Sequence, residues 1–180
     1  TGGSKGLGKE LVQMLSELGY ITVYTYTKKK PKIFSSKNIY GFKMNLQNEK
    51  EIKSIFRKIK FQLRAYPSIL INNAAIAQEK KFEEISYKDY EKMMRINLIG
   101  QMIITREFIL NFKKQINNYG RIINISSIGG QIGGKNQVHY AAAKAGLINF
   151  SKSIANLYSK EKITCNSIAI GLVKTKMSSK

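Results

Sequence analysis

Cysteine, proline, histidine and acidic residues are scarce in this sequence, and tryptophan is absent. The single Cys165 cannot form an internal disulfide, which is typical of a reducing, cytoplasmic setting. With one histidine, no cluster of His, Cys and Asp has the spacing of metal ligands, so we expect no metal. The longest apolar runs, such as 69–71 and 122–123, are far too short to cross a bilayer, so we expect no membrane partner.

Acidic residues number 11 against 31 lysines and arginines, which gives a formal net charge of +20. Such a charge can attract nucleic acid, an anionic membrane or an acidic protein. Between Glu49 and Tyr66, however, apolar residues recur at helical spacing and basic residues line the opposite side. We interpret this stripe as the solvated face of an amphipathic helix, and since no nucleic-acid-binding motif is present, we expect no nucleic-acid partner. The stripe comprises Lys50, Lys53, Arg57, Lys60 and Arg64.

Short β-rich runs alternate with longer helical stretches along the chain. This alternation is typical of the α/β class, with a parallel sheet between helices on both faces in a three-layer αβα architecture. Consecutive apolar residues within two of the runs are typical of strands that are buried on both faces. The predicted strands are 21–26, 39–44, 68–71, 121–126 and 164–168, and the predicted helices are 6–18, 48–66, 87–112 and 140–158.

The chain has 180 residues, of which 43% are hydrophobic, and it predicts one domain with a substantial core over residues 1–180. Its two prolines, Pro31 and Pro67, both lie between predicted elements. Both ends look truncated, because no strand precedes the turn at Thr1 and residues 174–180 are polar where another element is expected. We therefore predict that the first and last strands of the sheet are missing and that residues 1–180 alone are poorly stable.

Glycines at positions 2, 6 and 8 open the chain, at the start of the predicted helix 6–18. Glycine permits a tight turn and lets the backbone approach a pyrophosphate without a Cβ in the way. The helix that follows directs its N–H groups and the positive end of its dipole at the same phosphate. Because this helix is amphipathic and a β-like run follows it, the loop predicts dinucleotide binding in a Rossmann-type, doubly wound sheet.

The residues after the run 21–26 indicate which dinucleotide is bound. A site for NAD usually has an acid here, which accepts hydrogen bonds from the ribose. In this sequence the run continues with Thr27, Lys28 and two further lysines, and it has no acid. Lysine and threonine can bind a 2′-phosphate that an acid would repel, and Lys5 in the glycine loop can reach the same group. NADPH/NADP+ is therefore favoured over NAD, although one of the three lysines is expected to be an ordinary solvated turn residue.

A serine, a tyrosine and a lysine form the second pattern that carries chemistry. Tyr140 and Lys144 are four residues apart on a predicted helix, so they project from one face. Ser127 follows the predicted strand 121–126, and groups at the carboxyl end of a parallel strand face the cofactor crevice. The spacing therefore predicts that Ser127, Tyr140 and Lys144 converge beside the dinucleotide.

These patterns resemble the classical short-chain dehydrogenase/reductase family over essentially the whole chain. The matching segments are T-G-x-x-x-G-x-G at 1–8, N-A-G as Asn73-Ala74-Ala75, 96–100 with Asn97, Ser127 with Tyr-x-x-x-Lys at 140–144, and a variant of N-x-x-x-P-G-x-x-x-T at 166–175. The resemblance implies an oxidoreductase that acts on CH–OH or C=O groups. It also implies cofactor contacts from Gly2, Ser4, Lys5, Gly6, Leu7, Gly8, Thr27, Lys28, Asn45, Leu46, Asn73, Ala74, Tyr140, Lys144, Val173 and Thr175.

Three positions depart from the family pattern. Ile170 stands where the family usually has proline, which removes a rigid turn beside the nicotinamide. Asn45 stands where an adenine-contacting aspartate is common, and its amide can replace part of that hydrogen bonding. Ala75 replaces a glycine and adds a methyl group close to the cofactor. None of the three touches the residues that transfer the proton.

By this resemblance Tyr140 is the general acid that protonates the developing alkoxide. A free phenol titrates near pH 10, and we expect the Lys144 ammonium to lower the pKa of Tyr140. The resemblance further implies that Lys144 binds the nicotinamide ribose, that Asn97 helps to hold a water relay and that Ser127 hydrogen-bonds the substrate oxygen. His139 has no acid or nucleophile at hand, and we interpret it as a surface residue at the start of the helix.

Within the family, segments 120–127 and 140–152 look most similar to 3-oxoacyl-[acyl-carrier-protein] reductases. Those enzymes use NADPH and meet an acidic carrier protein, which agrees with the positive charge of this chain. Members of the family are commonly tetramers, and a shared helix face formed by Ala142, Gly146 and Phe150 suits a homotetramer. Candidate carrier contacts, with solvated helix ends as the alternative, are Lys113, Lys114, Lys160 and Lys162.

Other functions stay open at this point. A sibling reductase that acts on a sugar, a steroid or a small ketone would share every motif, and the substrate lid that separates them follows Met177 in such enzymes. A non-catalytic NADP-binding module usually loses the tyrosine or the lysine, both of which are present here. A basic nucleic-acid binder would show a steeply salt-dependent affinity for duplex DNA.

Overall fold

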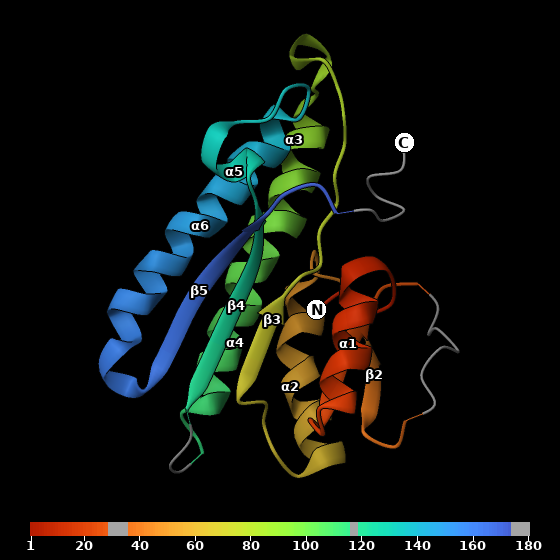
Figure 1. The fold of residues 1–180 in the computed structure, drawn as a ribbon, viewed down its shortest axis with the longest axis vertical. Helices are drawn as coiled ribbons and strands as arrows, with labels where there is room; N and C mark the ends of the chain where they lie inside the picture. Colours follow the sequence, from red (N-terminus) through yellow and green to blue (C-terminus); the bar gives the residue numbers. More distant parts are fainter. Residues whose placement is uncertain (29–35, 116–118, 174–180) are drawn as a thin grey trace.

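The computed structural model describes residues 1–28, 36–115 and 119–173 (Figure 1). Thr175, Lys29 and Lys30 lie outside these residues. The principal elements in chain order are α1 (Gly6–Glu17), β1 (Thr22–Tyr26), β2 (Ile39–Lys43), α2 (Glu49–Leu63), β3 (Ile69–Asn72), α3 (Tyr87–Met94), α4 (Gly100–Phe112), β4 (Gly120–Ser127), α5 (Gly129–Ile132), α6 (Val138–Tyr158) and β5 (Ile163–Ile170).

All strand pairs among the described residues are parallel, but the strands form two sheets. β1 pairs with β2, and Thr22 lies opposite Ile39. β3, β4 and β5 pair in that order, and Ile69 lies opposite Arg121. Every predicted strand is confirmed to within two residues at each end. The α/β class and the Rossmann-type arrangement are therefore confirmed, with a gap between β1 and β3.

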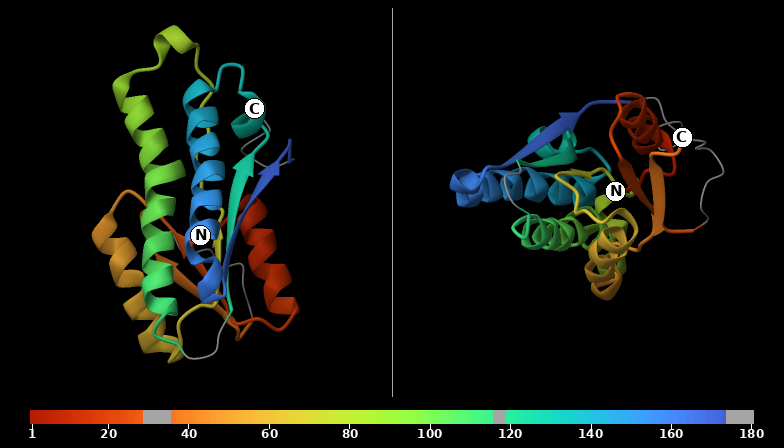
Figure 2. Two further views of the ribbon diagram at one scale, coloured as in Figure 1. Left: turned by 90° about the vertical axis from the view of Figure 1, so that its left-hand side faces the viewer. Right: turned by 90° about the horizontal axis from the view of Figure 1, so that it is seen from below.

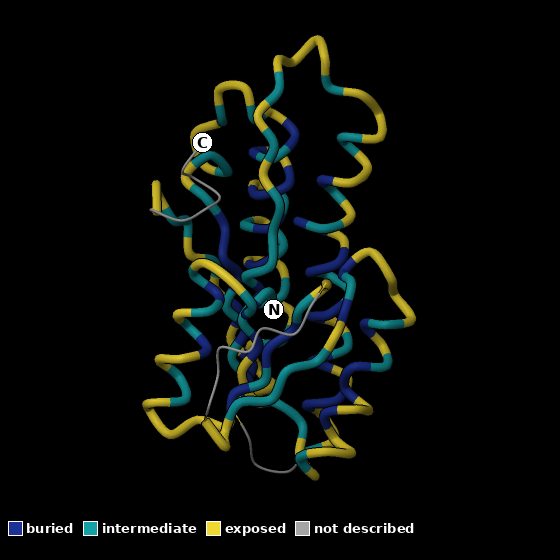
Figure 3. The backbone as a smooth tube through the Cα atoms, turned by 90° about the vertical axis from the view of Figure 1, so that its right-hand side faces the viewer, coloured by how far each residue is buried: buried dark blue, intermediate teal, exposed yellow. Residues whose placement is uncertain are grey.

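Helices cover both faces of the strands. α1 lies on one face, whereas α2, α4 and α6 lie on the other (Figure 2). Buried positions concentrate on the inward sides of the helices and along the strands, and the outer helix faces are exposed (Figure 3). The apolar face of α2 is buried and its basic stripe is exposed, as the spacing predicted. The main core cluster includes Ile52, Ile55, Phe56, Ile59, Ile104, Phe108, Ile122 and Ile163.

The long helix predicted for 87–112 is interrupted by one π-helical turn. α3 begins with a capping box in which Ser86 and Asp89 satisfy each other's backbone N–H groups. A π-helical turn over Arg95–Ile99 (η2) then joins α3 to α4. Two short 3-10 helices, η1 (Phe82–Glu84) and η3 (Ser159–Glu161), and the short α5 were not predicted. In the part of the chain that the structure describes, no helix has the length and apolar character needed to span a membrane.

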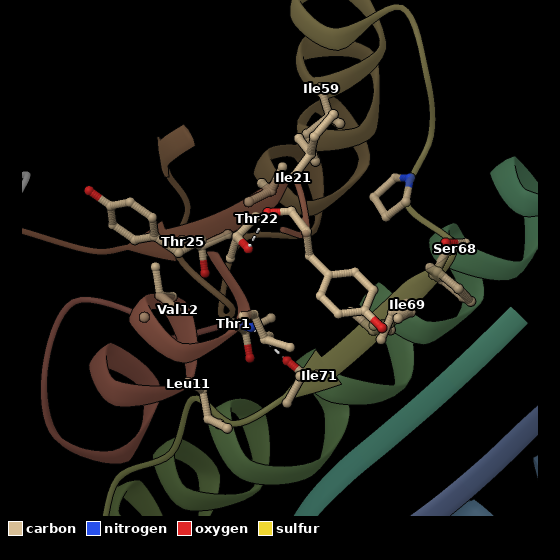
Figure 4. Close-up of a pocket in the computed structure, with 18 of the residues that line it drawn as sticks. Thr1, Leu11, Val12, Ile21, Thr22, Thr25, Ile59, Ser68, Ile69 and Ile71 are labelled. Carbon is tan, nitrogen blue, oxygen red and sulfur yellow. Dashed lines mark hydrogen bonds between the residues drawn. The ribbon is translucent and has the colours of Figure 1, made fainter. Parts of the chain in front are cut away.

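A cavity of about 440 Å³ lies between the facing edges of β1 and β3 (Figure 4). On one side it is lined by apolar residues of α1, and on the other by apolar residues of α2 and α4. Thr1 lies at one end of the cavity, where its amino group donates to the Ile71 carbonyl at 2.6 Å. Lining residues labelled in Figure 4 include Leu11, Val12, Ile21, Ile59 and Ile69.

Candidate active site

The glycine loop makes a tight turn between the start of the chain and α1. Gly2 has a φ of 67°, a left-handed conformation that favours glycine. A Cβ on Gly8 would overlap the Gly2 carbonyl oxygen and come within 2.5 Å of the Asn73 amide nitrogen. Among the described residues, no side chain caps the first turn of α1 and no acid lies in it, so its N–H groups are available to an anion. The loop is a cradle that a Cβ would fill, and it fits a pyrophosphate.

Thr1 and Asn73 join this loop to the carboxyl end of β3. The Thr1 hydroxyl accepts hydrogen bonds from the backbone N–H groups of Asn73 at 3.1 Å and of Ala74 at 3.0 Å. In return, the Asn73 amide donates to the carbonyl oxygens of Thr1 at 3.0 Å and Gly2 at 3.3 Å. The structure therefore brings the predicted contact residues Asn73 and Ala74 to the cradle, where the Asn73 side chain supports the loop.

Ser127 and Tyr140 meet on the same edge of the sheet. β3 and β4 are parallel, with Asn72 opposite Asn124, so their carboxyl ends point the same way. Ser127 is the last residue of β4 and lies about 10 Å beyond Asn124, at the usual rise of a strand. Its hydroxyl is hydrogen-bonded to that of Tyr140, and it also accepts from the Gly129 N–H at 3.2 Å. Both side chains can thus reach one oxygen atom of a substrate.

Lys144 lies one helical turn after Tyr140 and is 3% exposed. Its ammonium donates to the Ile125 carbonyl at 2.6 Å and lies 5.8 Å from the centroid of the Tyr140 ring. Burial lowers the pKa of Lys144 to about 8. Burial raises the pKa of Tyr140, and the hydrogen bond with Ser127 opposes that shift. The expected lowering of the Tyr140 pKa by Lys144 is absent from this structure, because the ammonium is directed at a β4 carbonyl.

We expect Lys144→Met to stabilise the fold at pH 7. The unfolded chain holds the lysine proton up to about pH 10.5 and the folded chain releases it near pH 8, so the charged form opposes folding. The pKa shift of Lys144 corresponds to about 3 kcal/mol of unfolding free energy at pH 7. The gain in stability of Lys144→Met over the unchanged protein shrinks as the pH rises from 8 towards 10.5. Denaturant unfolding at pH 7 and pH 10 measures it, with the exposed Lys152→Met as the control. A lower unfolding free energy for Lys144→Met at pH 7 contradicts this expectation.

Asn97 lies in the π-helical turn η2 and is completely buried. Its Oδ1 accepts from the Ile76 N–H at 2.9 Å, and its Nδ2 donates to the Ile76 carbonyl at 2.8 Å. One turn further, Gln101 donates to the Ala74 carbonyl at 2.6 Å. Asn97 and Gln101 therefore hold the segment that leaves the cradle. The supporting role of Gln101 was not predicted, because a single polar residue inside an apolar helix belongs to no recognisable motif.

Known proteins share this sequence and this fold. The family model described as short chain dehydrogenase matches residues 1–180. The chain belongs to this family. Its members are oxidoreductases that act on CH–OH or C=O groups with a nicotinamide cofactor, and the cradle described above fits such a cofactor.

Individual relatives agree with the family assignment. A 3-oxoacyl-[acyl-carrier-protein] reductase of Aquifex aeolicus is 35% identical over 185 residues, which cover 98% of this chain and 73% of that protein. Nodulation protein G of a Rhizobium species is 33% identical and matches 100% of this chain and 74% of its own length. An aldohexose dehydrogenase of Thermoplasma acidophilum has a TM-score of 0.89 at 23% identity, covering 98% of this chain and 66% of that chain. This last likeness shows the fold alone.

The short-chain dehydrogenase motifs that surround the cradle are placed as follows. Thr27 and Lys28 follow β1 directly and are exposed. Asn45 lies just beyond β2, where its Oδ1 accepts from the Gln47 N–H at 3.0 Å, and Leu46 is buried. Ser4 and Leu7 are half-buried, and Lys5 and Gly6 are exposed in the cradle itself. Val173 is 39% exposed beyond the end of β5.

The structure corrects the interpretation of His139 as a surface residue at the start of the helix. It is completely buried, because the aromatic ring of Tyr90 packs edge-on at 6.0 Å and its Nε2 lies 3.3 Å from the Gln78 Oε1. Burial lowers the pKa of His139. The sequence gave no signal for this, since the contacting residues come from a loop and a helix about 50 to 60 positions earlier in the chain.

The lysines predicted to contact a carrier protein lie far from Ser127. The Gly120 N–H donates to the Lys162 carbonyl at 3.0 Å, and Gly120 begins the strand that Ser127 ends. Seven residues of a strand span about 23 Å. Lys113, in addition, pairs with Glu161 at 2.7 Å. These lysines therefore fit the alternative interpretation, solvated residues at helix ends, better than contacts with a carrier protein.

Proposed function

We propose that the protein reduces the carbonyl of a 3-oxoacyl thioester, carried by an acyl carrier protein, with NADPH as the reductant. The hydrogen bond between the hydroxyls of Ser127 and Tyr140, at the carboxyl edge of the sheet to which Asn73 also ties the glycine loop, is the observation that carries this proposal. The names of relatives at 35% and 36% identity, in Aquifex aeolicus and Rickettsia typhi, support the substrate.

The chain's own residues have three tasks in this reaction. When bound, the cofactor supplies a hydride, which no side chain can provide. Ser127 and Tyr140 hold the substrate oxygen between their hydroxyls, and Tyr140 donates its proton to the oxygen as negative charge develops there. The phenol of Tyr140 is protonated at neutral pH, as a proton donor requires, and burial raises its pKa further. Lys144, one helical turn after Tyr140, would hold the ribose of the cofactor, and Asn97 positions the segment at Ile76 through two hydrogen bonds.

The choice of NADPH rests on charge. Thr27 and Lys28 present a hydroxyl and an ammonium at the carboxyl end of β1, where an acid would select NAD. Lys5, exposed in the cradle, adds a second cation. We further propose one domain over residues 1–180, a homotetramer packed through α4 and α6, and a cytoplasmic location, all of which rest on the family resemblance.

Oxidation of NADPH, followed at 340 nm with a 3-oxoacyl thioester, tests the function. We expect turnover with NADPH and a much lower kcat/KM with NADH at the same concentration. An aldohexose and a small ketone serve as comparison substrates. Binding of NADPH without turnover of the thioester would leave the family assignment intact and refute the substrate, and equal use of NADH would refute the role of Thr27 and Lys28.

A further inference from the structure

Three hydrogen bonds tie the loop after the cradle to the start of α6. The Lys80 N–H donates to the Asn136 carbonyl at 2.9 Å, and the Gln137 amide donates to Glu79 at 3.3 Å. The third bond, at 3.3 Å, joins the Gln78 Oε1 to the Nε2 of His139. His139 immediately precedes Tyr140, so this loop contacts the first turn of the helix that carries the proposed general acid.

Asp89 fixes the direction of the bond between Gln78 and His139. The Gln78 Nε2 donates to the Asp89 Oδ1 at 3.1 Å, because an ionised carboxylate can only accept. Lys80 also donates to Asp89, at 2.8 Å, and hydrogen bonds from Lys80, Ser86 and Gln78 hold the pKa of Asp89 well below its usual range. The Gln78 Oε1 therefore faces His139, and the imidazole must carry its proton on Nε2 and donate. Asp89 on α3 thus fixes the orientation of the Gln78 side chain, and Gln78 in turn fixes which nitrogen of His139 on α6 carries the proton.

The first turn of α6 needs this support. Among the described residues no side chain caps its N-terminus, and no acid lies in its first turn. The first N–H groups of a helix have no partner within the helix, and an uncapped first turn frays more readily. Tyr140 lies in this turn, and its hydroxyl must stay within hydrogen-bonding distance of Ser127. His139 is the one residue of the turn whose side chain is completely buried against the preceding elements.

We propose that Gln78, Asp89 and His139 form a positioning network that holds Tyr140 in register with Ser127. The network touches neither substrate nor cofactor and acts through the backbone of the first turn of α6. This inference rests on the proposed role of Tyr140 as the general acid. A displacement of about 1 Å at a catalytic group can lower the rate by 10²-fold, which sets the scale of the effect.

Kinetics and hydrogen exchange of the purified protein test the network. We expect His139→Ala to lower kcat about 10- to 100-fold, with the Kd for NADPH, from its fluorescence, changed less than about twofold. Amide exchange should accelerate at residues 138–142 and 76–80 and stay unchanged in β4. His139→Gln keeps a donor near the Nε2 position and should restore most of kcat. The exposed Gln62→Ala is the control for Gln78→Ala.

A double-mutant comparison separates positioning from general destabilisation. If the network acts as a unit, Gln78→Ala combined with His139→Ala lowers kcat no further than either change alone. An unchanged kcat for His139→Ala, exchange that accelerates throughout the chain, or additive losses in the double variant would each overturn the proposal. If the wild-type protein does not turn over the thioester, the proposed substrate fails, and the exchange pattern at 138–142 still decides whether His139 holds this turn.

Discussion

Tyr140→Phe is expected to lower kcat for carbonyl reduction by about 10²–10⁴-fold, the range that a positioned general acid contributes. The substitution removes one hydroxyl and leaves the ring in place. Tyr140 is half-buried and its hydroxyl contacts Ser127, so loss of the oxygen removes the proton donor and half of the site for the substrate oxygen. The cradle is built from the backbone of the glycine loop and is held by Thr1 and Asn73, neither of which is changed, so the Kd for NADPH should change less than about threefold.

Single-turnover kinetics with saturating NADPH measure this effect without interference from product release. Tyr87→Phe is the matched control, because Tyr87 is 80% exposed at the start of α3 and far from β4 in sequence and packing. Retention of kcat within about fivefold in Tyr140→Phe would show that another group donates the proton. Loss of NADPH binding in the same variant would show that the ring supports the fold of the site.

Residues in local patterns could be predicted well from the sequence. The strand ends, the buried face of α2 and the placement of Ser127 beside Tyr140 follow from periodicity and from motif spacing, which depend on nearby residues. The glycine cradle follows for the same reason, since the φ of Gly2 and the close approach at Gly8 are local demands.

Features that depend on distant contacts could not be predicted. The Lys144 ammonium donates to the backbone carbonyl of Ile125, a contact that the spacing of residues in the sequence does not reveal. The expected lowering of the Tyr140 pKa by Lys144 was therefore wrong for this structure. His139 is buried by Gln78 and Tyr90, which are distant in sequence. The π-helical turn at Asn97 was not predicted either, because α4 is apolar on most of its sides and its sequence has no clear helical phase in which an inserted residue could be detected.

The cavity between β1 and β3 has the form of a position for one more parallel strand. Apolar side chains line both faces, and the two strand edges that border it have no strand partner on that side among the described residues. At its end, the Gly3 N–H donates to the Thr25 carbonyl at 3.1 Å and Thr1 donates to Ile71, so the chain already bridges β1 and β3 at this point.

An amino-terminal extension of six residues rich in valine and isoleucine should therefore raise the unfolding temperature of residues 1–180 and sharpen the transition. Covering the apolar side chains that line this cavity would remove them from water, which stabilises a fold by about 25 cal/mol per Å² of apolar surface buried. Residues 1–180 with and without the extension are compared by thermal unfolding followed by circular dichroism. The same six residues at the carboxyl end, and an extension of alternating lysine and glutamate, are the controls. A sharp transition at high temperature for unextended residues 1–180 would show that β1 and β3 need no strand between them.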